Sequence, residues 1–309
     1  MKTITILFSA LLLFSACSDS EKQKVIDAIQ DINIKNDVEA DTVTSLDDTL
    51  SETSGLAYID GTLWSHNDSG SKAELNVIDQ ENGSILKTVT VSNATNIDWE
   101  DLAFNDTHLF IGDFGNNEGM RQDLAIYKIK LTDLKTKTTV EAEKLAFSYA
   151  DQNDFTKNAD TNYDCEAFIA YENQLYLFTK NHGNEETNVY KLSVNSGTEV
   201  SEKVTTYNTN ALVTGASIDL SNNVLALIGY SASGDNKGTP KTWIFSEFTD
   251  ADFFEGTQDK LTWGTPAKAQ IEGVTHLDTG KLYIASEKLD YSNSLGSFTI
   301  KQELYRLDY

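Results

Sequence analysis

The sequence predicts an all-β fold, a five-bladed β-propeller of four-stranded blades closed by an N-terminal strand. Three observations predict it. A unit of blade length recurs five times, short apolar runs alternate with turns rich in Asn, Asp, Gly and Ser, and no helical period competes after residue 40. The 309 residues suffice for one large domain of this kind.

Each unit opens with two strands. A short strand that begins with a small or acidic residue leads through a polar turn into an apolar strand. The first strands begin at Ser54, Glu100, Glu166, Ala216 (or Ser217) and Glu272; the second strands contain Leu63-Trp64, Leu109–Ile111, Leu175–Leu177, Val224–Leu227 and Leu282–Ile284. The starts are 46, 66, 50 and 56 residues apart, which is typical of propeller blades with variable loops.

Two further strands complete a unit. We expect third strands at Leu75–Ile78, Ala125–Ile129, Asn188–Leu192, Thr242–Phe245 and Glu303–Leu307, and fourth strands at Ile85–Val91, Glu143–Tyr149, Val204–Tyr207 and Lys260–Trp263. The fifth unit ends at Tyr309 without a fourth strand. We expect Asp41–Asp48 to supply it, because an outer strand from the N-terminus closes the ring and removes exposed edges. A six-bladed ring is the alternative, if the interval from 100 to 166 contains a further blade.

The N-terminus reads as a targeting segment. A positive charge at Lys2 precedes an apolar run too short to span a bilayer, and Leu13–Cys17 resembles the lipobox of bacterial lipoproteins. We therefore expect a signal peptide over 1–16, a lipid on Cys17, a polar tether over 17–40 and the propeller over 41–309. The alternative is an ordinary secretory signal with an incidental Cys.

This organisation predicts the location of the protein. We expect a monomer anchored in the bacterial cell envelope through Cys17, on the periplasmic or surface side. Ser18 follows Cys17, so the Asp that retains some lipoproteins at the inner membrane is absent, which favours the outer membrane.

Charge and cysteine content exclude several classes of protein. The formal net charge of -24 would repel a phosphate backbone, which argues against a nucleic-acid partner, and would attract cations. Two Cys cannot form a disulfide scaffold. Cys165 stands at the start of an apolar strand, where a small buried thiol is expected rather than a nucleophile.

The first-strand starts predict a metal site. Inner strands of a propeller line its channel, so Ser54, Glu100, Glu166, Ser217 and Glu272 should ring one mouth. Several converging carboxylates need a cation or a proton, and Ca²⁺ prefers six to eight oxygen ligands. The alternative is that these Glu side chains accept hydrogen bonds from backbone amides of neighbouring inner strands and serve as structural latches.

The second-strand ends should lie around the same mouth. There we expect His66 and Asp68 as candidate catalytic bases. The candidate ligand contacts are Asn67, Asp113, Asn116, Lys180, His182, Glu287 and Lys288. The alternative for the Asn and Asp residues is that they build Asx-turns.

Several of these motifs resemble a widespread group of uncharacterised secreted bacterial propellers. The matching segments are Ser54–Ala57, Asn67–Gly70, Trp99–Ala103, Gly112–Asn116 and Ile126–Ile129. The resemblance covers most of residues 50–290 and implies the propeller fold, but it implies no activity.

A more distant resemblance is to the calcium-activated nucleotidase (apyrase) family, five-bladed propellers with a central Ca²⁺. The Ser and Glu positions at 54, 100, 166 and 272 are similar to those around the family's ion. The chain departs from the pattern in the fourth blade and at Asp68-Ser69, where the family has an Asp-Arg pair that clamps phosphate. A weaker similarity to esterase-like phytase propellers lies in the fifth unit.

Three functions follow from these observations. The first is an envelope lipoprotein that binds Ca²⁺ in its channel and uses the Glu-lined funnel to bind a small molecule, glycan or protein. The second is a Ca²⁺-dependent phosphoester or phosphoanhydride hydrolase, for which cations near the metal are sparse. The third is a purely structural envelope assembly protein with a plugged channel. The fold alone does not decide between them.

Overall fold

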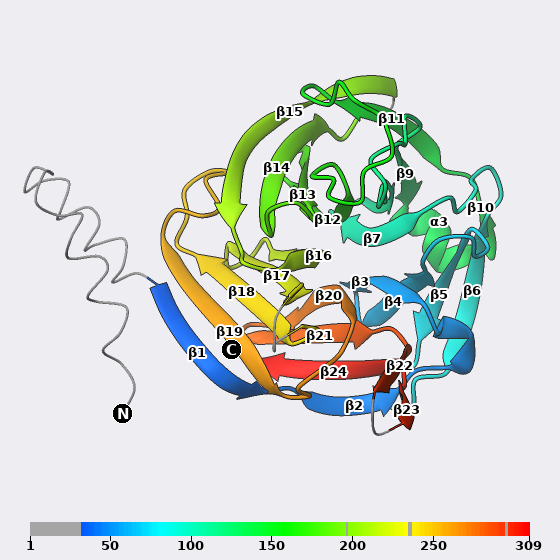
Figure 1. Ribbon diagram of the computed structural model, residues 1–309. Coiled ribbons are helices and arrows are strands. Elements are labelled where there is room, and N and C mark those ends of the chain that lie inside the picture. The colour runs from blue at the N-terminus through cyan, green and yellow to red at the C-terminus, as the bar shows by residue number, and fades with distance from the viewer. Residues whose placement is uncertain (1–31, 196, 234–236, 294–295) are drawn as a thin grey trace, which may run out of the picture.

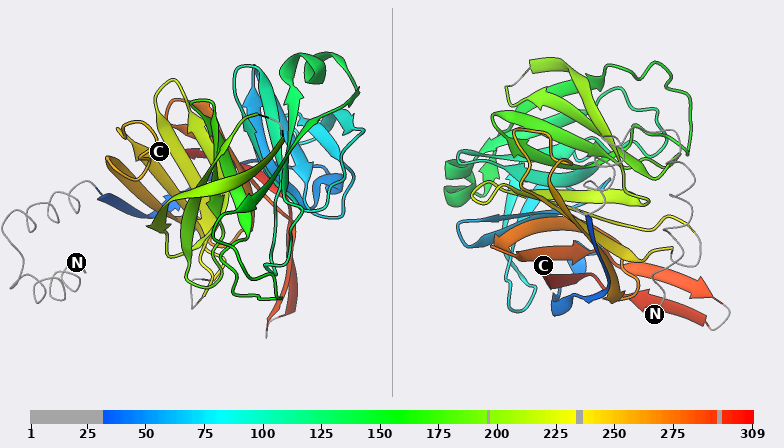
Figure 2. Two further views of the ribbon diagram at one scale, coloured as in Figure 1. Left: turned by 90° about the horizontal axis from the view of Figure 1, so that it is seen from above. Right: turned by 90° about the vertical axis from the view of Figure 1, so that its left-hand side faces the viewer.

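The computed structural model describes residues 32–195, 197–233, 237–293 and 296–309, and its fold is all-β. Its sheets stand side by side around a common centre (Figures 1 and 2). The signal peptide and Cys17 of the sequence analysis lie outside the described residues. Within the described residues, no helix has the length and apolar character needed to cross a membrane.

The first repeat forms one antiparallel sheet. Its strands are β3 (Thr53–Ile59), β4 (Thr62–Asn67), β5 (Glu74–Ile78) and β6 (Ile85–Val91), and β10 (Thr139–Val140) pairs in parallel with β6. A short 3-10 helix, η1 (Asp48–Leu50), precedes β3 and buries Leu50. The strand order along the chain is also the order in the sheet, from the inner strand β3 outwards.

The second and third repeats share an eight-stranded sheet. The second contributes β7 (Trp99–Phe104), β8 (His108–Asp113), β9 (Ala125–Lys130) and β11 (Glu143–Tyr149), with helix α3 (Leu131–Thr136) after β9; the third contributes β12 (Cys165–Tyr171), β13 (Gln174–Thr179), β14 (Glu186–Ser193) and β15 (Gly197–Asn208). Each half is antiparallel. The halves join where the outer strands β11 and β15 pair in parallel, from Leu145 opposite Gly197 to Tyr149 opposite Ser201.

The fourth repeat gains a strand that the sequence analysis assigned to the tether. Its own strands are β16 (Leu212–Asp219), β17 (Val224–Tyr230), β18 (Pro240–Ser246) and β19 (Thr257–Thr265). Outside them β1 (Ile32–Glu39) pairs in parallel with β19. Most of β1 is exposed, so backbone pairing with an open sheet edge rather than side-chain burial orders this part of the expected tether.

The fifth repeat takes its outer strand from the N-terminus, as predicted. The order is β2 (Asp41–Ser45), β24 (Glu303–Asp308), β21 (Lys281–Ser286) and β20 (Ile271–Asp278), and β2 is antiparallel to β24. The hairpin of β22 (Leu289–Asn293) and β23 (Gly296–Ile300), which the sequence analysis did not predict, is inserted before β24.

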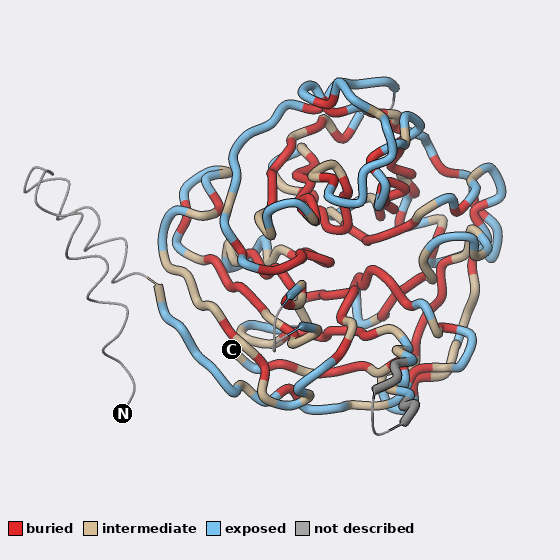
Figure 3. The backbone as a smooth tube through the Cα atoms, in the orientation of Figure 1, coloured by how far each residue is buried: buried red, intermediate tan, exposed pale blue. Residues whose placement is uncertain are grey.

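Apolar cores fill the spaces between neighbouring sheets. Trp64 and Trp99 share one core between the first two sheet units, and Phe114 packs edge-on against Phe168 in the next. Another, containing Leu56 and Tyr283, joins the fifth unit to the first. Burial is concentrated on the inner strands, as Figure 3 shows. Each fully buried large side chain contributes about 1.5–3 kcal/mol to this packing.

Asp101 ties three inner strands together near the centre. Its buried carboxylate accepts hydrogen bonds from the backbone N–H groups of Leu102 in β7 (2.8 Å), Phe168 in β12 (3.1 Å) and Ala216 in β16 (3.2 Å). We had considered the first-strand Glu side chains as latches between inner strands. Asp101, the residue after Glu100, forms such a latch.

Candidate functional site

The starts of the inner strands converge at one end of the ring, which we call the acidic end. The Ser54 hydroxyl donates to the Glu100 carbonyl oxygen, joining β3 to β7. The charge of Glu166 raises the pKa of Glu100, and that of Glu272 contributes to the raised pKa of Glu166, although burial is the main cause of both shifts. These four predicted residues therefore lie together.

The strand register corrects the predicted position in the fourth repeat. Equivalent inner and second-strand pairs are Ala57–Trp64, Ala103–Phe110, Ile169–Tyr176, Ser217–Ala226 and Thr275–Tyr283. Three residues before each inner member stand Ser54, Glu100, Glu166, Thr214 and Glu272. Thr214, not Ala216 or Ser217, is thus the counterpart, and its hydroxyl donates to the Ile271 carbonyl oxygen at 2.6 Å.

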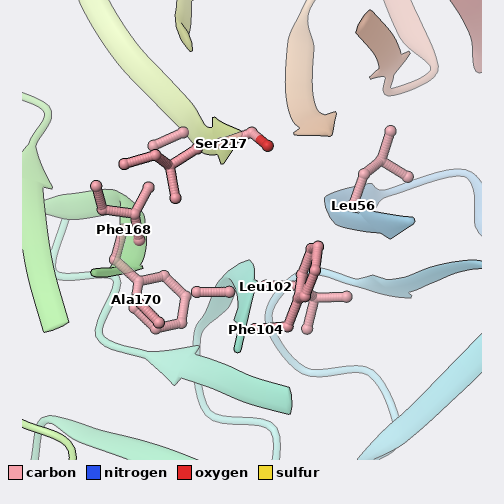
Figure 4. Close-up of a pocket in the computed structure, with 10 residues that line it drawn as sticks. Leu56, Leu102, Phe104, Phe168, Ala170 and Ser217 are labelled. Carbon is pink, nitrogen blue, oxygen red and sulfur yellow. The ribbon is translucent and has the colours of Figure 1, made fainter. Parts of the chain in front are cut away.

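Ser217 lies further along β16, so its assignment to the metal site was wrong. Its hydroxyl oxygen accepts a hydrogen bond from the His276 backbone N–H at 3.1 Å and lies 3.0 Å from His276 Nδ1. With apolar residues such as Leu56 and Phe168, it lines the space drawn in Figure 4. That space is about 10 Å³, roughly the room for one water.

Glu166 already has a counter-ion within the chain. Lys180 Nζ lies 2.7 and 2.6 Å from the two carboxylate oxygens of Glu166, and 5.5 Å from the centre of the Tyr230 ring. Burial alone would lower the pKa of Lys180, but Glu166, with Tyr230 and Glu272, holds it well above its usual value. The buried ion pair neutralises Glu166 without a metal and occupies Lys180, which we had predicted to contact a ligand.

Among the described residues, no Lys or Arg forms an ion pair with a second group of carboxylates at the acidic end, although the charges of Lys180 and Arg121 partly offset the raised pKa values of Asp68 and Asp98. Oxygen atoms of Asp68, Asp98 and Glu100 lie within 4.8 Å of one another. Burial raises the pKa of Asp68 to about 6, and burial with the charge of Asp68 raises that of Asp98 to about 7. Burial also raises the pKa of Glu100 well above its usual value. The sequence analysis named Asp68 as a candidate base and did not include Asp98 among the metal ligands.

Gly115 lets the backbone pass against these carboxylates. A Cβ at this position would lie 2.0 Å from Glu100 Oε1 and 2.5 Å from Asp98 Oδ2. The Gly115 N–H donates to the Asp98 carbonyl oxygen at 3.2 Å, which fixes the turn beside them. The Gly112–Asn116 motif thus forms a cradle with space for carboxylate oxygens and no room for a side chain.

Asp113 and Asn116 build that turn. Asp113 Oδ1 accepts from the Asp98 N–H at 3.1 Å and pairs with Arg121 at 2.9 Å. Arg121 also donates to the Gly115 carbonyl oxygen at 2.8 Å, and its own N–H donates to Asn116 Oδ1 at 2.8 Å. These contacts agree with the turn role that we had considered for both residues, and they occupy the Arg121 guanidinium.

The two predicted His residues differ in their surroundings. His66 is completely buried, its ring packs edge-on against Trp99 with centres 5.6 Å apart, and burial lowers its pKa to about 4. Complete burial and a lowered pKa both disfavour the predicted role of His66 as a base. His182 is partly exposed, and its Nε2 lies 3.0 Å from Asp164 Oδ2.

The remaining predicted contacts lie around the acidic end. Asn67 Nδ2 donates to the Thr49 carbonyl oxygen at 2.7 Å, a structural role. Glu287 accepts from Gln270 Nε2 at 2.6 Å, and burial, with the charge of Glu272, raises its pKa to about 9. Lys288 pairs with the exposed Asp290 at 3.0 Å.

No family model and no curated protein sequence matches this chain. Among solved structures, it is similar to a glucose dehydrogenase, with a TM-score of 0.47 and 9% identity over 86% of this chain and 98% of that chain. It is also similar to the exo-beta-1,3-galactanase of Phanerochaete chrysosporium solved with galactose. There the TM-score is 0.46 and the identity 13%, over 82% of this chain and 59% of that chain.

Proposed function

We propose that this protein is a five-bladed β-propeller of the cell envelope that binds Ca²⁺ at Asp68, Asp98 and Glu100 and binds a ligand at its acidic end. The observation that carries the proposal is the convergence of these three carboxylates, two of which lie against Gly115. Among the described residues, none of the three has a paired cation of the kind that Lys180 provides for Glu166.

The sheet pairing supports five blades. Each of β3, β7, β12, β16 and β20 is the inner strand of a four-stranded antiparallel unit, and β2 completes the last unit. The long interval in the second repeat holds α3, β10 and the segment 150–164, which contains no strand of its own. The content of that interval supports five blades over six.

The donor chemistry favours Ca²⁺ over softer metals. All three side chains offer carboxylate oxygens, which hard cations prefer, whereas Zn²⁺ sites are typically built from Cys and His. The thiol of Cys165 and the ring of His66 are both completely buried. When bound, the cation would neutralise the three carboxylates and could offer open coordination positions to a ligand. Asp68 and Asp98 are partly exposed, so such a ligand could reach them.

The cationic side chains near this site already form ion pairs within the protein, which favours ligand binding over phosphate hydrolysis. Phosphate transfer needs positive groups that are available to phosphate oxygens. Here Lys180 is bound by Glu166, and Arg121 is bound by Asp113 and backbone carbonyls. Asp68, with its pKa near 6, is the residue that could act as a base if hydrolysis occurred.

Calcium titration by isothermal calorimetry tests the proposal. We expect the purified protein to bind one Ca²⁺, and Asp98→Asn and Glu100→Gln each to weaken binding at least tenfold. Glu143→Gln, which removes a half-exposed carboxylate of β11, is the matched control and should bind like the wild type. Absence of Ca²⁺ binding by the wild type, or equal affinity in all variants, would contradict the proposal.

A further inference from the structure

A second site lies beside the acidic end. A cavity of about 590 Å³ is walled by Leu212, Ala232, Ala269 and Leu289 together with the Tyr230 ring. Its volume falls within the range of about 300–1,000 Å³ typical of small-molecule sites, which are largely apolar with a few polar groups. Of its lining residues, the functions considered above use only His182, as a predicted ligand contact.

Backbone hydrogen bonds hold the walls of this cavity in place. The Ala269 N–H donates to the Gly238 carbonyl oxygen at 3.3 Å, and the Gly238 N–H donates to the Ser231 carbonyl oxygen at 2.8 Å. Leu212 and Tyr230 are paired partners in β16 and β17. The cavity is therefore formed by connected elements of the fourth and fifth repeats and exists before a ligand arrives.

Two of the polar side chains that line the cavity are positively charged, beside the neutral Ser231 and Gln270. Lys237 and Lys268 both line it, and the ammonium of Lys268 donates to the Lys237 carbonyl oxygen, which holds the two residues together. Neither ammonium forms an ion pair with a carboxylate among the described residues. His182 lies on the same wall. In a chain with a formal net charge of -24, two lysines at an apolar cavity favour a negatively charged ligand.

We propose that this cavity binds a small amphipathic organic anion. The apolar body of the ligand packs against Leu212, Ala269 and Leu289, and its acidic group lies at Lys237 and Lys268. The site is distinct from the three carboxylates that would hold the cation, so its occupancy does not require metal.

A pair of fluorescent probes tests the charge preference. The probes are 8-anilinonaphthalene-1-sulfonate, an aromatic anion, and N-phenyl-1-naphthylamine, its uncharged analogue, each titrated in chelator and in Ca²⁺. We expect Lys237→Glu/Lys268→Glu to weaken binding of the anion at least tenfold and binding of the neutral probe less than twofold. Lys130→Glu/Lys203→Glu makes the same charge change at exposed positions elsewhere and should leave both affinities unchanged.

A cavity-filling variant tests the apolar wall. Ala232→Trp should weaken both probes, because the indole occupies the space of the ligand body, and circular dichroism should show an unchanged fold. Failure of the wild type to bind the anion, or equal affinity in the wild type and the two cavity variants, would overturn the proposal. Anion binding that disappears in chelator would also overturn it, because the ligand would then depend on the cation.

Discussion

Both carboxylate oxygens of Glu166 accept hydrogen bonds from the buried Lys180 ammonium, at 2.7 and 2.6 Å. This pair divides the acidic end into two parts. Glu166 is neutralised by a cation of the chain itself, whereas Asp68, Asp98 and Glu100 must share protons or an external cation. The position of Lys180, directly after β13, thus leaves Asp68, Asp98 and Glu100 as the candidate cation site.

Removal of Lys180 should strongly destabilise the protein. Lys180→Met leaves Glu166 buried without its partner, which typically costs about 3–5 kcal/mol in the free energy of unfolding. Urea denaturation measures this cost. Lys180→Met/Glu166→Gln removes both charges and should recover most of the loss. A double variant as unstable as the single one would show that the ion pair is not the cause.

Gly115→Ala should abolish Ca²⁺ stabilisation. The added methyl would overlap Glu100 Oε1 and Asp98 Oδ2, which would have to move apart. We expect Ca²⁺ to raise the Tm of the wild type in thermal melts and to leave that of Gly115→Ala unchanged. Gly61→Ala adds the same methyl where nothing lies within 4 Å, although its φ of +82° costs about 1 kcal/mol. Gly61→Ala should keep the rise in Tm with Ca²⁺. If both variants lose this rise, a general loss of stability rather than the altered cradle would be the cause.

The fold was largely predictable because it depends on a repeated local pattern. Alternating apolar strands and polar turns recur in every unit, so the inner, second and third strands and the closing β2 follow from sequence alone. Strand β1 was missed because its side chains are mostly polar and exposed. Backbone pairing with β19 positions the strand, and its apolar residues, Ile32, Ile34 and Val38, alternate with polar ones too weakly to predict it.

The site was predictable only in outline. The recurring Glu residues indicated the acidic end, but the fourth position was misplaced. Every inner strand has a register shift at this point, and in β16 it lies between Val213 and Gly215, at Thr214. The sequence held a signal for this, because Thr214-Gly215 corresponds to Ser54-Gly55 and Glu272-Gly273. The pairing of Lys180 with Glu166 spans two strands and has no local motif.

The predicted lipid anchor can be tested independently of the fold. Cells expressing the protein and grown with an alkyne-labelled palmitate should incorporate label into it, and Cys17→Ser should incorporate none and be released from the membrane fraction. Cys165→Ser is the control, because that thiol is completely buried in the folded protein. A wild-type protein that incorporates no label would support the ordinary secretory signal, and label that persists in Cys17→Ser would show that the lipid is attached to another residue.

Asp101→Asn should destabilise the fold without changing Ca²⁺ affinity. The carboxylate accepts from three backbone N–H groups on different inner strands, and an amide would direct its own N–H groups at some of these donors. Each buried donor left without a partner costs about 1–3 kcal/mol. We expect a loss of about 2–4 kcal/mol in urea denaturation, with calorimetry in Ca²⁺ unchanged. A parallel loss of affinity would place Asp101 in the cation site.

In the presence of a chelator, ionisation of Asp98 should lower the free energy of unfolding as pH rises. Burial and Asp68 raise its folded pKa from 3.8 to about 7, so the neutral carboxyl favours the folded state. That contribution is complete below about pH 4 and is lost as pH rises to 7. In chelator, Asp98→Asn and the wild type should have the same free energy of unfolding at pH 4. At pH 8 the variant should be more stable by about 1–2 kcal/mol. This difference is smaller than the full pKa shift implies, because the side chain is partly solvated. Bound Ca²⁺ would stabilise the ionised carboxyl. With Ca²⁺ at pH 8, the wild type should therefore be more stable than Asp98→Asn. A constant difference between the two proteins from pH 4 to pH 8 would show that Asp98 titrates normally.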